Sequence, residues 1–165
     1  DDWQFEVWGC GLSEKMFWNW QEFNSLGEHN TVRDFHCVTT WSRYDNNWQG
    51  VPVGAFWDVI QSKLEEGVSP SAVMLHCYGG YTTNLLIDDF LKTDNLFATH
   101  HDAKPLTIPH GGPMRFVCHH LYAWKSAKWI SGIELLENDE RGFWERNGYH
   151  IRGDPWDEER YSYQE

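Results

Sequence analysis

Large apolar and polar side chains alternate along residues 3–7, and this period of two predicts a β-strand. A second short extended segment at residues 15–18 is expected to pair with the first. Residues 20–26 are expected to form a short helix that Asn19 caps at its N-terminus. The β-branched and aromatic residues of 31–36 predict the next strand, so the first third of the chain is mostly β.

The pattern becomes less regular after this strand. Turn-forming residues occupy positions 42–47, and a loop is expected to continue over residues 48–52. Apolar residues then recur at helical spacing, which predicts a helix over residues 53–66. A buried strand is expected at residues 72–78, and the glycine pair 79–80 predicts a tight turn after it.

The second half of the chain continues with short elements. A short helix is predicted at residues 87–91, and a hairpin is predicted from residues 96–100 and 106–108. Residues 130–136 are expected to form the last core strand. Strands and short helices mix without a regular strand–helix–strand rhythm, which argues against a doubly wound sheet. The pattern therefore predicts an α+β protein with a mostly β core.

Length and charge limit the classes of protein that need to be considered. With 165 residues, the chain is expected to form a single domain over residues 1–165, with residues 138–165 as a tail that wraps around it through aromatic side chains. There is no apolar run of the length that a membrane helix needs. The formal charge of −12 repels nucleic acids and anionic membranes. Neither nucleic-acid binding nor membrane insertion is therefore expected.

Four cysteines lie far apart and form no Cys-x-x-Cys pair, so a structural zinc knuckle is not indicated. Free thiols in a reducing compartment are the simpler interpretation, and with no signal peptide visible in the sequence a cytoplasmic location is expected. Cys37 follows a predicted strand at the point where the strand opens into a loop. A thiolate there is a candidate metal ligand or nucleophile, and the alternative is a small buried apolar residue.

Basic residues gather in one short span of this acidic chain. The span contains His110, Arg115, Lys125 and Lys128, with Ser126 between the lysines. The glycine pair 111–112 lies in the same span, and glycines allow a backbone to approach a ligand closely. Fixed positive charge beside flexible backbone suits a phosphate-bearing ligand, and a solvated charged face is the alternative.

Histidines and aromatic residues offer further candidates. The doublets 100–101 and 119–120 would be the source of ligands in a zinc hydrolase, although adjacent residues on a strand point to opposite faces. Tyr81 follows the glycine turn and is either a site phenol or an ordinary turn-adjacent aromatic residue. Trp41 and Trp124 are candidate walls of a cleft.

Four segments taken together resemble the sulfite oxidase family of molybdenum enzymes, and in particular its small stand-alone bacterial members. The segments are residues 36–42 (HCVTTWS), 80–85 (GYTTNL), 110–115 (HGGPMR) and 124–129 (WKSAKW). The resemblance runs from about Trp3 to the C-terminus, and its motifs are specific in order and spacing. It implies a sulfite oxidase-type molybdopterin-binding domain.

The resemblance also implies roles for individual residues. Cys37 would be the protein ligand of molybdenum, beside the dithiolene of a single pterin. His110 and Arg115 would contact the pterin and its phosphate. This cradle would be completed by Ser126, Ala127 and Lys128. Cys77 corresponds approximately to a cofactor-contacting position in relatives, and Tyr81 is assigned to the substrate side.

The function implied by the resemblance is two-electron oxygen-atom transfer on a small substrate such as sulfite or a sulfoxide. The direction of the reaction and the electron-transfer partner are not readable from the sequence. A cofactor-binding or carrier module without turnover is the alternative, because no electron-transfer domain accompanies the motifs.

Overall fold

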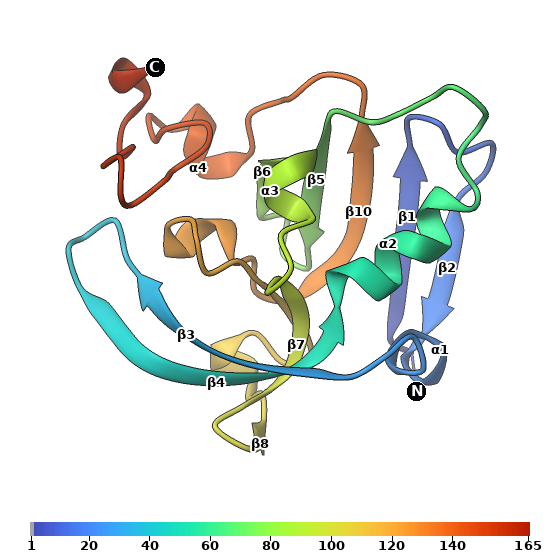
Figure 1. Ribbon diagram of the computed structural model, residues 1–165, viewed down its shortest axis with the longest axis horizontal. Helices are drawn as coiled ribbons and strands as arrows, with labels where there is room; N and C mark the ends of the chain where they lie inside the picture. Colours follow the sequence, from blue (N-terminus) through green and yellow to red (C-terminus); the bar gives the residue numbers. More distant parts are fainter. Residues whose placement is uncertain (1) are drawn as a thin grey trace.

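The computed structural model describes residues 2–165, and its core is formed by two five-stranded sheets (Figure 1). The first sheet has the strand order β2-β1-β10-β5-β6. Its strands are β1 (Gln4–Gly9), β2 (Met16–Asn19), β5 (Ala72–Cys77), β6 (Thr82–Leu86) and β10 (Ile130–Leu136). Strands β1 and β10 pair in parallel, and the other neighbours are antiparallel.

The second sheet has the order β3-β4-β7-β8, and β9 pairs with β7. Its strands are β3 (His29–His36), β4 (Ser42–Pro52), β7 (Leu96–His101), β8 (Lys104–Pro105) and β9 (Arg115–Val117). The helices are short: α1 (Trp20–Asn24), α2 (Val53–Gln61), α3 (Ile87–Phe90) and α4 (Phe143–Arg146). Three 3-10 turns complete the fold, at η1 (Ile108–His110), η2 (Ala123–Lys125) and η3 (Ser162–Gln164). The fold is α+β with a mostly β core, as the sequence predicts.

Aromatic rings hold the two sheets together. Phe5 of β1 and Phe97 of β7 are both fully buried, and their ring centroids lie 5.7 Å apart. Phe56 of α2 joins them, with its ring centroid 5.0 Å from that of Phe97. Each fully buried phenylalanine contributes about 1.5–3 kcal/mol of transfer free energy. These rings join the two sheets in one large core cluster, and smaller clusters around Trp48 and Met74 lie apart from it.

Elements with strong local signals form where they are predicted. The predicted N-cap is present, because Asn19 Oδ1 accepts from the Glu22 amide at 2.9 Å and the Glu22 carboxylate accepts from the Asn19 amide at 2.8 Å. The strands expected near residues 31–36, 72–78 and 130–136 appear as β3, β5 and β10. The hairpin after residue 96 forms from β7 and β8, but its second arm is Lys104–Pro105 and not residues 106–108, because the chain turns into η1 at Ile108.

The largest difference from the sequence prediction is at residues 42–52. The predicted turn and loop are wrong, because this segment is β4, the longest strand of the described chain. β4 pairs with β3 along most of its length and with β7 at its C-terminal end, so ladder hydrogen bonds override the local turn preference. The turn-forming residues survive as a bulge, where Asp45 has φ 54° and the Asn46 side chain donates to the carbonyls of Arg33 and Arg43.

Two further boundaries differ. The helix predicted over residues 53–66 ends at Gln61, and the chain beyond it turns to donate from the Glu65 amide to the Gly11 carbonyl at 2.8 Å. Strand β6 is not predicted by the sequence pattern, and it forms because it pairs with β5 along its whole length. Among the described residues, no helix combines the length and apolar character needed to cross a membrane.

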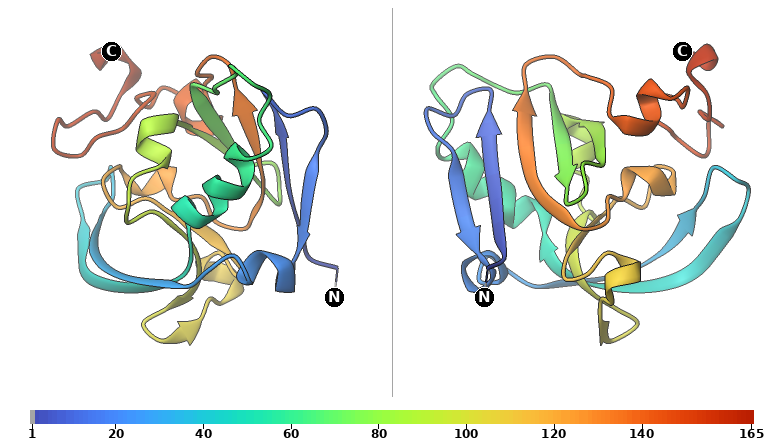
Figure 2. Two further views of the ribbon diagram at one scale, coloured as in Figure 1. Left: turned by 45° about the vertical axis from the view of Figure 1, so that its right-hand side comes forward. Right: turned by 180° about the vertical axis from the view of Figure 1, so that it is seen from behind.

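The β3–β4 hairpin projects beyond its own sheet. β7 pairs only with the last five residues of β4, Trp48 to Pro52, so the far half of the hairpin has no third strand beside it. It curves away from the N-terminal end of the molecule (Figures 1 and 2). Residues 37–41 form its turn, which we call the cysteine turn. The Cys37 amide donates to the Trp41 carbonyl at 2.9 Å, and the Thr40 amide donates to the Cys37 carbonyl at 3.0 Å.

Candidate functional site

The main cavity of the molecule has a volume of about 680 Å³ and lies against the β3–β4 hairpin. Its other walls come from the segment before β9 and from η2 and the residues after it. This volume is within the range of small-molecule and cofactor sites. Phe35, Trp48, Trp129 and Trp144 line it with flat apolar faces. Trp41 and Trp124 also line it, so the prediction that they form cleft walls is confirmed.

Arg115 provides a buried cation in this cavity. Its side chain donates from Nη1 to the His110 carbonyl at 3.2 Å and from Nη2 to the Ser126 carbonyl at 2.8 Å. The guanidinium packs on the rings of Phe35 and Trp48 at 5.6 and 5.3 Å. Its Nε is buried and has no partner. Burial lowers the pKa of Arg115 to about 10, so the group stays charged at neutral pH, and the Nε–H is among the donors left over for an anion.

His110 and Lys128 lie on the rim of the same cavity. Lys128 Nζ donates to the Pro109 carbonyl at 2.8 Å, and burial followed by the nearby Arg115 charge lowers the pKa of this lysine. The glycine pair acts differently from the sequence expectation. A Cβ at Gly111, where φ is 100°, would lie 2.9 Å from Lys128 Cγ, and one at Gly112 would lie 2.3 Å from the Leu106 carbonyl oxygen. The glycines therefore allow neighbouring segments of the protein, and not a ligand, to approach the backbone closely. This packing brings His110 and Lys128 to the same rim of the cavity.

A second basic group was missed by the sequence analysis. Arg43 donates to His101 Nε2 at 2.8 Å and to the Asp102 carboxylate at 2.6 Å. Arg43, His101 and Asn46 all line the cavity. Burial lowers the pKa of His101 against the opposing effect of Asp102, so a neutral imidazole accepts from the guanidinium. The sequence analysis did not select Arg43 because residues 42–47 were predicted to form a turn.

Tyr81 lines the cavity from the first sheet, where it precedes β6. Its hydroxyl donates to the Trp124 carbonyl at 2.6 Å. Burial, followed by the Glu145 carboxylate, raises the pKa of this phenol well above its usual range. Tyr81 is therefore a neutral group whose proton is already engaged, and its oxygen retains lone pairs that can accept from a bound molecule.

Lys125 does not belong to the cavity, which corrects its place in the predicted anion site. Its ammonium is fully buried and lies 2.7 Å from Glu145 Oε1. It also donates to the Asn84 carbonyl at 2.8 Å and to the Ile151 carbonyl at 2.6 Å. In the tight 3-10 turn, neighbouring side chains leave in different directions, so Lys125 enters the interior while Ser126 lines the cavity.

The Lys125–Glu145 pair is expected to be a large contributor to folding. Replacing Lys125 alone with methionine would leave a buried carboxylate without its cation, and the free energy of unfolding should fall by roughly 3–5 kcal/mol. The double variant Lys125→Met/Glu145→Leu should recover much of that loss, because no uncompensated charge remains. Urea unfolding of both variants checks this. A Lys125→Met variant as stable as the wild type would contradict it.

The four free cysteines differ in environment. Burial raises the pKa of Cys77 to about 12 and places the pKa of Cys118 above its usual range, so both remain protonated thiols at neutral pH. Cys77 lies in β5 within the hydrophobic core and does not line the main cavity. Cys10 lies at the end of β1, where its amide donates to the Leu135 carbonyl at 2.8 Å.

Cys37 is half-buried in the cysteine turn, and its Sγ lies 3.2 Å from Thr39 Oγ1. The cysteine side chain itself does not line the main cavity, but Trp41, which closes the same turn, does. Two described cysteines, Cys77 and Cys118, are excluded as thiolates by burial. Cys37 is therefore the cysteine that the fold places in an accessible turn adjoining the cavity.

The structure brings together most, but not all, of the residues selected from the sequence. The residues that line the cavity are Tyr81, His110, Arg115, Ser126 and Lys128. Cys37, Cys77 and Ala127 do not line it. Ala127 is buried behind the cavity, where its carbonyl accepts from the Phe116 amide at 2.9 Å. The individual roles of these residues remain predictions.

The histidine doublets are not assembled into a metal site. Within residues 2–165, no three His, Cys, Asp or Glu side chains are grouped so that they could hold one metal ion. His100 interacts with Thr99 Oγ1 at 2.9 Å, while His101 faces Arg43. His120 interacts with the Asp89 carboxylate at 3.0 Å. Residues 2–165 therefore contain no cluster of ligands that would support a zinc hydrolase.

His119 lines a second cavity, of about 440 Å³, together with Asp34 and His36 of β3. Both of its ring nitrogens are buried without a hydrogen-bond partner. Burial lowers the pKa of His119 to about 4, against the opposing charge of Asp94. The neutral imidazole is therefore the form that the folded chain accommodates.

This environment predicts a pH-dependent stability. Unfolded chains bind a proton at His119 once the pH falls below 6.5, whereas the folded chain does not until about pH 4. The free energy of unfolding should therefore fall between pH 6.5 and 4, by about 2–3 kcal/mol from this residue. Urea unfolding at pH 7 and 5 should show a weaker pH dependence for His119→Phe than for the wild type. Equal pH dependence in the two proteins would count against this assignment.

Comparisons with known proteins identify the family. The model of the "Oxidoreductase molybdopterin binding domain" family matches residues 1–144. The chain belongs to this family. It is 44% identical over 161 residues to the uncharacterized oxidoreductase YuiH of Bacillus subtilis. The aligned region covers 98% of this chain and 79% of that protein. The family membership makes the chain a molybdopterin-dependent oxidoreductase of the sulfite oxidase type.

Two more distant proteins also match. A putative protein-methionine-sulfoxide reductase subunit, YedZ1 of Azospira oryzae, is 25% identical over 150 residues, which is 91% of this chain and 55% of that one. The chain thus spans about half the length of this relative. The sulfane dehydrogenase SoxCD of Paracoccus pantotrophus matches with a TM-score of 0.71 at 11% identity, over 89% of this chain and 40% of that one. At that identity the match shows the fold alone, and it confirms the fold class predicted from the sequence.

The residues of the main cavity fit the cofactor that the family name implies. A molybdopterin has a flat ring system and a phosphate, and the cavity offers indole walls together with Arg115, His110 and Lys128. The unpartnered and buried Nε of Arg115 is the clearest sign, because a buried donor without an acceptor is unfavourable unless a ligand supplies one.

Proposed function

We propose that this protein carries out two-electron oxygen-atom transfer on a small substrate, such as sulfite or a sulfoxide, with one pterin dithiolene per molybdenum held in the main cavity. One observation carries the proposal. A buried guanidinium with a free donor lies in an aromatic cavity at whose edge a turn carries the half-buried Cys37. An anion, a flat ring and a soft metal are the three things that these groups bind best.

In this proposal Arg115, His110 and Lys128 hold the phosphate of the cofactor. The fixed contacts of Arg115 to two backbone carbonyls orient its remaining donors before any ligand arrives. Ser126 contributes from the same wall, where its hydroxyl accepts from the Cys118 amide at 2.9 Å. The phosphate would thus be held by groups already fixed by the fold.

Cys37 is proposed as the thiolate ligand of molybdenum. When bound, the molybdenum-pterin group supplies a two-electron redox centre that can exchange an oxygen atom with a small substrate. A thiolate donates strongly to a metal in a high oxidation state, and a turn closed by two backbone hydrogen bonds keeps that ligand in a defined place. Cys77 is proposed only as packing beneath the site, because burial keeps it protonated.

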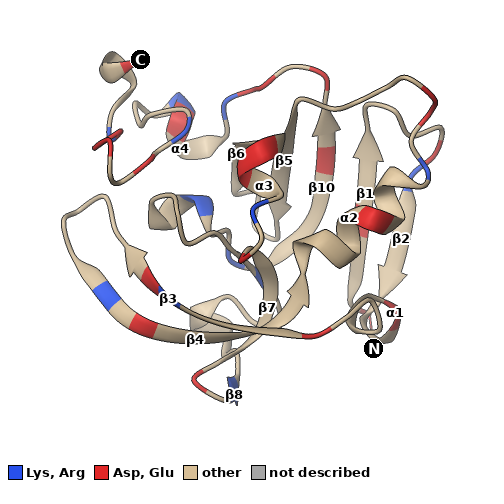
Figure 3. Ribbon diagram, viewed as in Figure 1, with Lys and Arg blue, Asp and Glu red and all other residues tan. Residues whose placement is uncertain are grey.

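Arg43 and Tyr81 are proposed to face the substrate. Arg43 carries a positive charge that attracts an oxyanion or the polarised oxygen of a sulfoxide, and Asp102 and His101 fix its orientation. The Tyr81 oxygen can accept a hydrogen bond from water or substrate. The chain has 25 acidic against 13 basic residues, and Figure 3 shows both kinds along the ribbon. The cations that line the main cavity therefore do not reflect the overall charge.

Both candidate reactions, oxidation of sulfite and reduction of a sulfoxide, balance in atoms and electrons. Sulfite and water would give sulfate, two protons and two electrons, and a sulfoxide with two protons and two electrons would give a sulfide and water. Both directions need an electron-transfer partner of unknown identity. The name of the Azospira relative, a putative protein-methionine-sulfoxide reductase subunit, supports testing the sulfoxide direction first.

The experiment that tests the function is an assay of purified, molybdenum-loaded protein with a methyl sulfoxide plus an artificial electron donor, and with sulfite plus an artificial acceptor. Turnover in one assay supports the proposal. Stoichiometric molybdenum and pterin without turnover in either assay would favour the alternative of a carrier module. Protein from a host able to insert the cofactor that still lacks molybdenum would contradict both.

A further inference from the structure

We propose that Arg160, in the C-terminal segment of residues 138–165, is a positioning residue that holds the cysteine turn in place for Cys37. The inference rests on the proposed function only in taking Cys37 as the metal ligand. It concerns a residue about 120 positions away in sequence, in a segment that none of the site motifs includes. Three observations carry it: the unsupported hairpin, the contact at its turn, and the anchoring of the C-terminal segment.

The hairpin needs support at its turn. β7 pairs with β4 only from Trp48 to Pro52, so the register beyond those positions is held by β3 alone. The bulge between Arg33 and Phe35 weakens the ladder further toward the turn. A two-stranded ribbon without a third strand is marginally stable in water. The position of a ligand at the end of such a ribbon therefore depends on what contacts the turn.

Arg160 makes that contact. Its Nη1 donates a hydrogen bond to the carbonyl of Val38, the residue after Cys37. The guanidinium also lies over the Tyr122 ring, with 5.1 Å between its carbon and the ring centroid. A second contact comes from the same segment, where the rings of Trp156 and His36 meet edge to face at 5.4 Å. The residues on both sides of Cys37 are thus held by the C-terminal segment.

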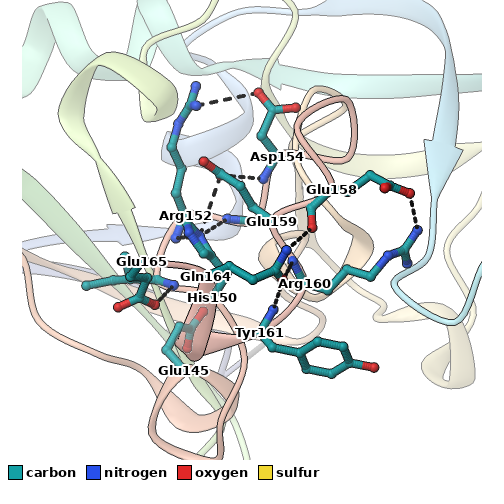
Figure 4. Close-up of polar contacts among 12 residues, drawn as sticks. Glu145, His150, Arg152, Asp154, Glu158, Glu159, Arg160, Tyr161, Gln164 and Glu165 are labelled. Carbon is teal, nitrogen blue, oxygen red and sulfur yellow. Dashed lines mark hydrogen bonds and ion pairs between the residues drawn. The ribbon is translucent and has the colours of Figure 1, made fainter.

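The C-terminal segment is itself fixed to the body of the protein, as a positioning device must be. The Tyr122 amide donates to the Gly153 carbonyl at 2.8 Å. The Arg152 guanidinium binds the buried Asp89 carboxylate at 2.9 Å. Within the segment, the Arg160 amide donates to the Gln164 side chain at 2.9 Å. Figure 4 shows this last contact together with other polar contacts inside the segment. The two views of Figure 2 agree with Figure 1 that this segment lies beside the tip of the hairpin.

The physical consequence is a restriction on the Val38 peptide. With the carbonyl held by a charge-assisted hydrogen bond, the turn cannot rotate Cys37 relative to the main cavity without breaking it. Without Arg160, the hydrogen bonds inside the turn move with it as a unit, and the ring contact between Trp156 and His36 is what remains from the C-terminal segment. A displacement of about 1 Å at a reacting centre can lower a rate by roughly 10²-fold. Arg160 is therefore expected to affect chemistry without touching the cofactor or the substrate.

Hydrogen exchange of the full chain, with and without cofactor, tests the contact itself. In Arg160→Gln, the amides of Cys37 and Thr40 should exchange about tenfold faster or more, as expected for loss of a charge-assisted hydrogen bond. In Arg160→Lys, the exchange rates of these amides should lie between those of the wild type and Arg160→Gln, because the lysine ammonium can donate to the carbonyl but offers no flat face to Tyr122.

Arg146→Gln is the matched control: Arg146 is an exposed arginine of the same segment whose side chain binds only the carbonyls of Arg141 and Gly142. It should leave both amides unchanged.

Loaded enzyme tests the positioning role. In Arg160→Gln, kcat should fall by roughly 10-fold or more while KM stays near the wild-type value. The electron paramagnetic resonance lines of one-electron-reduced molybdenum should broaden, and Arg160→Lys should restore both properties in part. Unchanged exchange at the turn, or faster exchange with wild-type kcat and spectrum, would overturn the inference. If the protein takes up no molybdenum, the proposed function fails while the exchange result still decides whether Arg160 fixes the turn.

Discussion

Replacing Cys37 with serine is expected to abolish turnover while the fold remains intact. The side chain is half-buried in a turn, and the backbone hydrogen bonds that define that turn do not involve the sulfur. A serine hydroxyl is a poor substitute for a thiolate as a donor to molybdenum. Loss of an outer-sphere partner of a metal ligand costs roughly 10–100-fold, so loss of the ligand itself should cost more than that. The measurement is kcat of loaded protein under the conditions of the sulfoxide and sulfite assays.

Cys10→Ser is the matched control for this prediction, because Cys10 is also half-buried but lies at the end of β1. It should keep wild-type turnover. Circular dichroism and urea unfolding should show that both variants fold like the wild type. A Cys37→Ser protein with full turnover would refute the assignment of this residue as ligand.

Arg115→Met is expected to have opposite effects on the empty and the loaded protein. Without a ligand, Arg115 is a buried cation, and burial has already lowered its pKa to about 10. Replacing such a group with an apolar side chain of similar length should leave the empty protein as stable as the wild type or more stable. With the cofactor, loss of the charge-assisted hydrogen bonds should weaken binding by roughly 10²-fold.

The measurements are molybdenum and pterin content after purification and urea unfolding of the cofactor-free chain. Arg115→Lys provides the control, because it keeps the charge but loses the fork-like geometry, and it should retain an intermediate amount of cofactor. A methionine variant with full molybdenum content and a destabilised empty form would mean that Arg115 has a purely structural role.

The sequence was sufficient to predict elements whose signal is local. The alternation of β1, the apolar run of β5 and the cap at Asn19 are each encoded within a few residues, and each forms where it is expected. The anion-binding side of the cavity was also accessible from the sequence, because His110, Arg115 and Lys128 lie within one short span. Here proximity along the chain translates into proximity in space.

The features that the sequence did not predict depend on contacts between segments far apart in the chain. β4 contains the turn formers Asp45, Asn46 and Asn47, and only pairing with β3 and β7 makes it a strand. The contact between Arg43 and His101 was missed for this reason, since Arg43 reaches His101 of β7 only because residues 42–52 form a strand of the same sheet. The direction of Lys125 could not be read from spacing, because a single 3-10 turn decides whether it faces the cavity or Glu145.

The C-terminal segment shows the same limit. Its aromatic composition suggested that it packs against the rest of the chain, but no sequence pattern indicated that Arg160 would bind the carbonyl next to Cys37. That contact joins residues from opposite ends of the chain. The contact depends on the fold, which places the hairpin and the C-terminal segment side by side.

X-ray absorption at the molybdenum edge of the loaded protein is the most direct test of the central claim, that the sulfur of Cys37 binds the metal. The wild type should show one sulfur neighbour more than the two that a single pterin dithiolene provides. The Cys37→Ser protein should have lost that additional sulfur. An unchanged number of sulfur neighbours in Cys37→Ser would show that Cys37 is not a ligand and would contradict the account.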